Sequence, residues 1–96
     1  MKLQPVFLIV DDLEYMRQTF RRVLIDMGAT RVFVAANGRD ALQLLQNESI
    51  SFILSDWNMP GLSGLDLLQT VRSMDAYRET PFVMVTAEAD IRYVKQ

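Results

Sequence analysis

The chain has 96 residues, of which 50% are hydrophobic and 23% are charged, and its formal net charge at pH 7 is −2. This length supports one domain around a single core, and the acidic balance offers no basic surface for nucleic acid. Cysteine and histidine are both absent, which excludes disulfides, thiolate nucleophiles, the commonest zinc ligands and an internal imidazole base. A metal bound by this chain is therefore expected to be a hard cation with oxygen ligands.

No signal peptide or membrane-spanning helix is predicted, because the apolar run at 6–10 is only five residues long before two aspartates. A cytoplasmic location and no membrane partner are expected. Arg17, Arg21 and Arg22 cluster on the polar side of a predicted helix, and we interpret them as a solvated face and not as a nucleic-acid contact.

The first half of the chain alternates between strand and helix patterns. Residues 6–10 (VFLIV) are a continuous apolar run, typical of a strand covered on both faces. From Leu13 the period becomes helical, and Gly28 is placed to end that helix. A second strand is predicted at 31–35 (RVFVA), and Asn37 can cap a second helix.

The second half repeats this alternation. Residues 51–55 (SFILS) predict a third strand, and Ser63 and Asp66 have the spacing of a capping box that starts a third helix. Residues 82–86 (FVMVT) predict a fourth strand, and residues 91–96 (IRYVKQ) are expected to begin a fourth helix. Such alternation predicts an α/β fold with a parallel sheet and helices on both faces.

Three carboxylates follow two of these strands. Asp11 and Asp12 come directly after the first strand, and Asp56 comes after the third. Because ligands of doubly wound sheets gather at the carboxyl ends of the strands, the three side chains are expected to converge if these strands are neighbours. Like charges so close together raise a carboxyl pKa or recruit a cation, and Mg²⁺ suits carboxylates, a carbonyl and waters.

A carboxylate beside Mg²⁺ can act as a nucleophile toward a phosphoryl group. Thr86, at the end of the fourth strand, could offer its hydroxyl to a phosphoryl oxygen. Each residue alone also has a simpler interpretation: Asp11 or Asp12 could cap the first helix. Asp56 could be a turn residue before a proline–glycine pair, and Thr86 an ordinary strand end. The joint pattern favours a site.

The chain resembles the receiver domains of bacterial two-component response regulators, especially the single-domain chemotaxis type. The matching segments are Val10-Asp11-Asp12, Ser55-Asp56-Trp57-Asn58-Met59-Pro60-Gly61 with Gly64 following, and Val85-Thr86-Ala87-Glu88. The resemblance covers essentially the whole chain, 1–96. It implies a flavodoxin-like doubly wound parallel sheet of order 2-1-3-4, in a receiver domain that lacks the fifth strand and fifth helix of the family and is incomplete at its C-terminus.

By this resemblance, Asp56 is expected to be the phosphoacceptor and Thr86 the switch hydroxyl that changes partner binding. Asp11, Asp12, Asp56 and the backbone carbonyl of Asn58 are expected to hold Mg²⁺. The expected donor is a histidine kinase or phosphotransfer domain, and the expected target is a downstream output protein or domain. The chain would then be a regulatory phosphoacceptor and not an enzyme, although family members catalyse phosphorylation from small donors and their own dephosphorylation.

The sequence departs from the family in one respect. The lysine that ends the fifth strand of receiver domains has no counterpart, because Lys95 falls in the expected fourth helix. The alternative is therefore a receiver-shaped interaction or dimerisation module without phosphotransfer. The fourth strand is expected to be an unpaired edge through which the chain self-associates, and the first helix to expose apolar surface.

Two further alternatives fit less well. A phosphatase of the haloacid-dehalogenase type needs two acidic residues spaced two apart after the first strand, whereas Asp11 and Asp12 are adjacent. A flavodoxin-like flavin binder needs a phosphate-binding loop at the same place, and the sequence Asp11-Asp12-Leu13-Glu14 would repel a phosphate.

Overall fold

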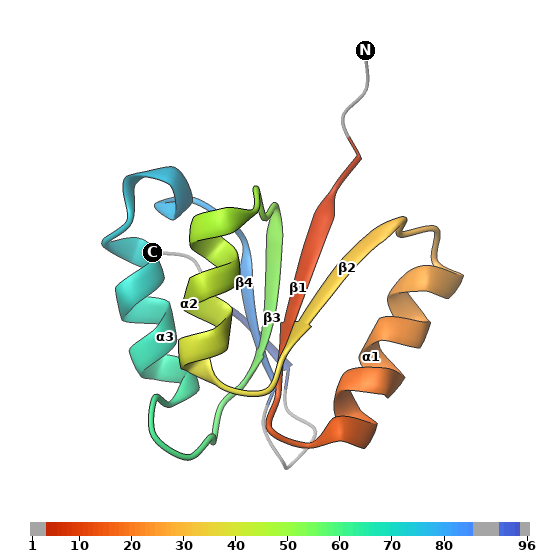
Figure 1. Ribbon diagram of the computed structural model, residues 1–96, viewed down its shortest axis with the longest axis horizontal. Helices are drawn as coiled ribbons and strands as arrows, with labels where there is room; N and C mark the ends of the chain where they lie inside the picture. The colour runs from red at the N-terminus through yellow and green to blue at the C-terminus, as the bar shows by residue number, and fades with distance from the viewer. Residues whose placement is uncertain (1–3, 86–90, 95–96) are drawn as a thin grey trace.

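The computed structural model describes residues 4–85 and the backbone of 91–94. In these residues the chain forms a sheet with helices on both sides (Figure 1). The elements in chain order are β1 (Val6–Val10), α1 (Glu14–Asp26), β2 (Arg31–Ala35), α2 (Gly38–Asn47), β3 (Phe52–Asp56), α3 (Gly64–Arg72), the 3-10 helix η1 (Asp75–Tyr77), β4 (Phe82–Val85) and β5 (Ile91–Val94).

The sheet order is β2-β1-β3-β4-β5. The first four strands in this order are parallel, so the predicted flavodoxin-like order 2-1-3-4 is confirmed. Parallel strands need crossover connections, and α1, α2 and α3 provide them between β1 and β4. The predicted strand and helix positions are confirmed to within about two residues at each end, which is the usual uncertainty of element boundaries.

The prediction of a helix at 91–96 is wrong where the structure describes it. Ile91–Val94 is a strand that pairs antiparallel with β4, with Val85 opposite Ile91 and Phe82 opposite Val94. The run contains two β-branched residues and a tyrosine, which suit a strand, and the free backbone groups of β4 offered it a partner. Consequently β4 is not an unpaired edge, and that expectation is also wrong.

The two faces of the sheet are covered unequally. In Figure 1, α2 and α3 lie together on one face, and α1 is the one helix of the described residues on the other. The main core lies under α2 and α3, where Leu8, Ile53 and Phe82 are fully buried. In contrast, α1 has no buried residue, and Met27 just after it is 78% exposed. The expected apolar exposure of the first helix is confirmed.

At the amino ends of the strands, main-chain groups form hydrogen bonds with side-chain hydroxyls. The Tyr77 hydroxyl is buried and lies 2.6 Å from the carbonyl oxygens of both Leu45 and Glu48, between the end of α2 and the start of β3. The hydroxyl of Ser51 accepts a 2.9 Å hydrogen bond from the amide of Val6. These bonds satisfy main-chain groups at the end of α2 and at the start of β1.

No helix within the described residues combines the length and the apolar character needed to cross a lipid bilayer.

Candidate functional site

The three aspartates meet at the carboxyl ends of β1 and β3. These strands are parallel neighbours, with Val10 opposite Ser55, so the residues that follow them leave the sheet at the same edge. One carboxylate oxygen from each of Asp11, Asp12 and Asp56 lies within 4.8 Å of the other two. The strand pattern predicted this convergence. All the donors are carboxylate oxygens, the chemistry that a hard divalent cation prefers.

Asp11 is the most buried member of the cluster, at 4% exposure. Its Oδ1 accepts a 2.9 Å hydrogen bond from the amide of Leu13, and its own amide donates to the Ala35 carbonyl at 3.1 Å. The N-cap position of α1 is Leu13, which makes no side-chain hydrogen bond. Neither Asp11 nor Asp12 is therefore the N-cap residue of α1, and the simpler interpretation of this pair does not hold.

Burial and mutual repulsion destabilise the charged carboxylates. Burial is the main cause that raises the pKa of Asp11, and the charge of Asp12 raises it further, although the hydrogen bond from the Leu13 amide lowers it. Burial also raises the pKa of Asp56, followed by the charge of Asp11, while a hydrogen bond from the Asn58 amide lowers it. A divalent cation would remove this repulsion, so the donor set fits Mg²⁺.

The loop after Asp56 places Trp57 and Asn58 at the rim of the cluster. Both side chains are exposed, Trp57 at 36%. The Trp57 amide donates to the Val85 carbonyl at 2.9 Å, which ties the loop to the end of β4. Asn58 is placed two residues beyond Asp56, with its amide toward the Asp56 carboxylate, and its role as a carbonyl ligand stays a prediction.

Helix α3 begins directly behind this loop. Ser63 and Asp66 form the predicted capping box, and the amide of Gly64 donates to the Trp57 carbonyl at 2.9 Å. A methyl group on Gly64 would collide with the Asp56 carbonyl oxygen and would lie 3.0 Å from the Trp57 Cα. Residue 64 must lack a side chain for the helix to begin this close to the end of β3.

Arg17 is the residue that the sequence interpretation missed. Its Nη1 donates to the carbonyl oxygen of Asp11 at 2.7 Å, and its charge lowers the pKa of Asp11. It is half-buried and does not belong to a purely solvated face. The sequence carries no signal for this contact, because Arg17 bonds to a main-chain oxygen and not to a side chain.

Thr86 lies outside the described residues. It follows Val85, the last residue of β4, and its assignment as a switch hydroxyl stays a prediction.

Comparison with known proteins identifies the family. The sequence-family model of the response regulator receiver domain matches residues 7–96. Chemotaxis protein CheY of Pseudomonas aeruginosa is 44% identical over 82 residues, which is 85% of this chain and 66% of that protein. CheY-3 of Vibrio cholerae is 40% identical over 82 residues, covering 85% of this chain and 63% of CheY-3. The chain thus spans less than two thirds of the length of either relative.

Solved structures give the same result. Chemotaxis protein CheY4 of Vibrio cholerae superposes with a TM-score of 0.85 at 36% identity, covering 92% of this chain and 72% of that one. The response regulator TrrA of Thermotoga maritima, solved in complex with Mg²⁺-BeF, has a TM-score of 0.80 at 26% identity, covering 88% and 70%. With its sheet order and its three converging aspartates, the chain belongs to the response regulator receiver domain family.

Proposed function

We propose that this chain is a phosphoacceptor switch of a two-component pathway, which takes a phosphoryl group from a histidine kinase or phosphotransfer domain onto Asp56. The observation that carries this proposal is the convergence of Asp11, Asp12 and Asp56, with carboxylate oxygens within 4.8 Å of one another. Their position at the carboxyl ends of β1 and β3 is where a doubly wound sheet binds its ligands. The proposed location is the bacterial cytoplasm.

Mg²⁺ is the proposed cofactor, held by the three carboxylates and the backbone carbonyl of Asn58. The crystallised complex of TrrA with Mg²⁺-BeF supports this choice. When bound, the ion would offset the negative charge on the phosphoryl oxygens. The raised pKa values of Asp11 and Asp56 mean that a cation binds here in competition with protons, so affinity should rise with pH.

In the transfer step, an ionised oxygen of Asp56 attacks the phosphorus atom of the donor. The new O–P bond gives an aspartyl phosphate, and the P–N bond to the donor imidazole breaks, so that the imidazole leaves with the bonding electron pair and takes up a proton. Because the chain contains no histidine, the imidazole comes from the partner. With acetyl phosphate as donor, the P–O bond breaks and acetate leaves.

Thr86 is the proposed switch residue, which turns phosphorylation of Asp56 into altered binding of an output protein or domain. Self-association is a separate proposal and needs a surface other than the edge of β4, because β5 pairs with that edge. The alternative function is a receiver-shaped interaction module that transfers no phosphate.

Incubation with acetyl phosphate and Mg²⁺, followed by intact-mass measurement, tests the proposal. The wild type should gain the mass of one phosphoryl group, the gain should vanish in EDTA, and Asp56→Asn should abolish it. Asp26→Asn is the matched control, because Asp26 is an exposed aspartate at the far end of α1. An adduct that persists in Asp56→Asn would move the nucleophile elsewhere. A wild type without any adduct, and with Trp57 fluorescence indifferent to Mg²⁺, would favour the interaction module.

A further inference from the structure

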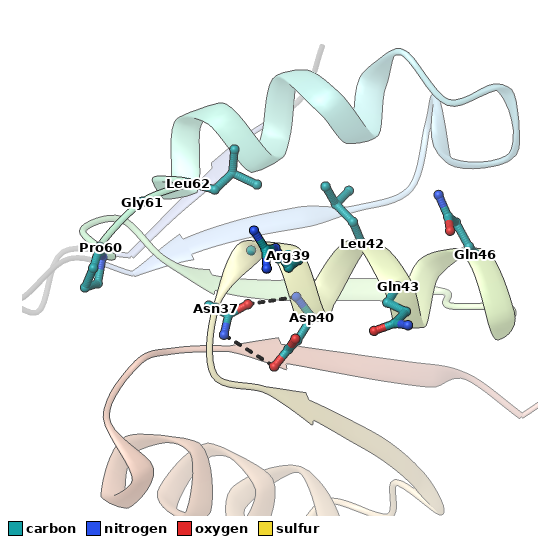
Figure 2. Close-up of a pocket in the computed structure, with 10 residues that line it drawn as sticks. Asn37, Arg39, Asp40, Leu42, Gln43, Gln46, Pro60, Gly61 and Leu62 are labelled. Atoms are coloured by element: carbon teal, nitrogen blue, oxygen red, sulfur yellow. Dashed lines mark hydrogen bonds between the residues drawn. The ribbon is translucent and has the colours of Figure 1, made fainter.

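Leu62, in the loop between β3 and α3, rests on the first residue of α2. Figure 2 shows Leu62 beside the first turn of α2, near Arg39 and Leu42, with Pro60 and Gly61 preceding it in the loop. A methyl group on Gly38 would lie 2.5 Å from Cδ2, 2.8 Å from Cβ and 3.0 Å from Cγ of Leu62. Leu62 therefore occupies the space that any side chain at residue 38 would need.

Space, and not backbone conformation, requires glycine at residue 38. Only Gly28 and Gly61 have positive φ among the glycines, so Gly38 has a backbone that any residue can adopt. Rotation of the Leu62 side chain would move Cδ2 but leave Cβ in place, so a methyl group at residue 38 would force the backbone of Leu62 to move.

The loop must yield in this collision because α2 is held firmly. The side chain of Asn37 caps α2 by accepting a 2.8 Å hydrogen bond from the amide of Asp40, and Ala41 and Leu45 on the next turns are buried in the core. A groove of about 840 Å³ lies next to Leu62, lined by residues of α2 and the Pro60–Leu62 segment. Leu62 can be displaced into this groove without entering the core, so the domain should still fold.

Only three residues separate Leu62 from Asn58. Met59 is buried in the core at 7% exposure, Pro60 has a fixed φ, and Gly61 holds a tight turn at a φ of 77°. The path along the chain from Leu62 to Asn58 is therefore short, and Pro60 allows little change of φ along it. The Asn58 amide donates a hydrogen bond to the Asp56 carboxylate, so the contact between α2 and the loop bears on the geometry of the candidate metal site.

We infer that Gly38 is a positioning residue: by leaving room for Leu62, it fixes the loop that presents Asn58 to the three carboxylates and so sets the affinity for Mg²⁺. This inference rests on the proposed function, since it assumes that the cluster binds Mg²⁺. Substitution of groups that orient metal ligands typically weakens binding by about 10- to 100-fold, and we expect Gly38→Ala to fall in that range.

A double-mutant cycle tests the inference in the full 96-residue chain. The four proteins are the wild type, Gly38→Ala, Leu62→Ala and the double variant, and Leu65→Ala, an exposed leucine on α3, is the matched control for Leu62→Ala. Mg²⁺ affinity is measured by titration of Trp57 fluorescence, and the metal-free Trp57 emission and the urea unfolding curve are recorded for each protein. Gly38→Ala should weaken Mg²⁺ binding and shift the Trp57 emission.

Removing the Leu62 side chain beyond Cβ from the Gly38→Ala protein should restore part of both signals, because the contacts at 2.5 Å with Cδ2 and 3.0 Å with Cγ are gone and only the contact with Cβ remains. Loss of stability alone would not be reversed by a second truncation, so restoration separates positioning from damage to the fold. Unchanged Mg²⁺ affinity in Gly38→Ala, or a double variant as weak as Gly38→Ala, would overturn the inference.

If the wild type itself does not bind Mg²⁺, the proposed function fails, and the metal-free emission of Trp57 then decides the structural part. A shift in Gly38→Ala that the double variant partly reverses would support the role of Gly38 in positioning the loop. Identical emission in all four proteins would overturn it.

Discussion

The two ends of the parallel sheet differ in how their polar groups are satisfied. At the amino ends, the buried hydroxyl of Tyr77 lies 2.6 Å from two carbonyl oxygens, and every group in that contact is neutral. At the carboxyl ends, three carboxylates of the same charge lie within 4.8 Å of one another, and burial and repulsion raise the pKa of two of them. The hydrogen bonds at the amino ends stabilise the folded state, whereas the carboxylate charges at the carboxyl ends destabilise it.

This contrast separates stability from function within one small domain. Hydrogen bonds to the neutral groups at the amino ends gain free energy on folding and need no ligand. The acidic cluster lowers the free energy of unfolding unless a cation or a proton is bound to it. A change at the amino ends should therefore alter stability and leave Mg²⁺ affinity alone, whereas a change at the carboxyl ends should alter both.

Gly64→Ala should produce the largest effect, because it breaks the packing behind the acidic cluster. The new methyl group would collide with the Asp56 carbonyl oxygen and lie 3.1 Å from the Met84 Sδ, and neither the strand end nor the buried methionine can withdraw easily. Overpacking of this kind costs about 3 kcal/mol of unfolding free energy. Urea unfolding measures the loss of stability, and the acetyl phosphate reaction measures the effect on phosphorylation.

Gln69→Ala serves as the control for Gly64→Ala, because Gln69 is exposed on the same helix. A Gly64→Ala protein as stable as this control and with full phosphorylation would contradict the requirement for glycine behind the site.

Tyr77→Phe should have the second largest effect and should be confined to stability. Loss of the hydroxyl leaves the carbonyl oxygens of Leu45 and Glu48 without this donor, which costs about 2 kcal/mol when the group is buried. Tyr15→Phe is the matched control, since Tyr15 is 64% exposed. Mg²⁺ affinity, measured by Trp57 fluorescence, should be the same in both. A weaker Mg²⁺ affinity in Tyr77→Phe would show that the two ends of the sheet are coupled.

Local patterns in the sequence predict the parallel order and the meeting of the carboxylates well. The apolar run before Asp11 and the one before Asp56 each end at the same edge of a parallel sheet, so the convergence follows once the strands are neighbours. The error at Ile91–Val94 has the opposite cause. A run of four residues does not distinguish a strand from a helix by period, and pairing with β4 decided its conformation.

Two contacts could not be predicted from the sequence. One is a hydrogen bond to a main-chain atom, and the other depends on the absence of a side chain at residue 38. Arg17 bonds to the main-chain carbonyl of Asp11, and no side-chain pattern marks where that oxygen points. Gly38 matters through the volume that Leu62 fills, and the two residues belong to different elements. Both contacts depend on how helices are placed against the sheet, which periodicity alone does not determine.

The difference in unfolding free energy between Asp56→Asn and the wild type should depend on pH. This dependence tests whether the charges at the carboxyl ends of the strands destabilise the folded state. Burial, and then the charge of Asp11, raises the pKa of Asp56 above its ordinary 3.8 in the folded protein. As the pH rises past 3.8, the unfolded chain loses this proton while the folded protein still holds it, so the free energy of unfolding falls. Above the raised pKa both states are ionised and the loss is complete, whereas well below 3.8 it is absent.

Asp56→Asn removes this loss, so the variant should be more stable than the wild type at neutral pH in EDTA. The gain should be on the order of 1 kcal/mol, the repulsion of two charges about 4 Å apart at a dielectric near that of water, as suits a half-exposed group. It should shrink as the pH falls toward 3.8. Glu79→Gln, at an exposed residue near the amino ends, should show no comparable gain in urea unfolding. Saturating Mg²⁺ should reverse the ranking, because the cation stabilises the protein with the complete ligand set more than the variant that has lost one ligand. A gain of equal size at every pH would mean that the charge of Asp56 is not what destabilises the folded state.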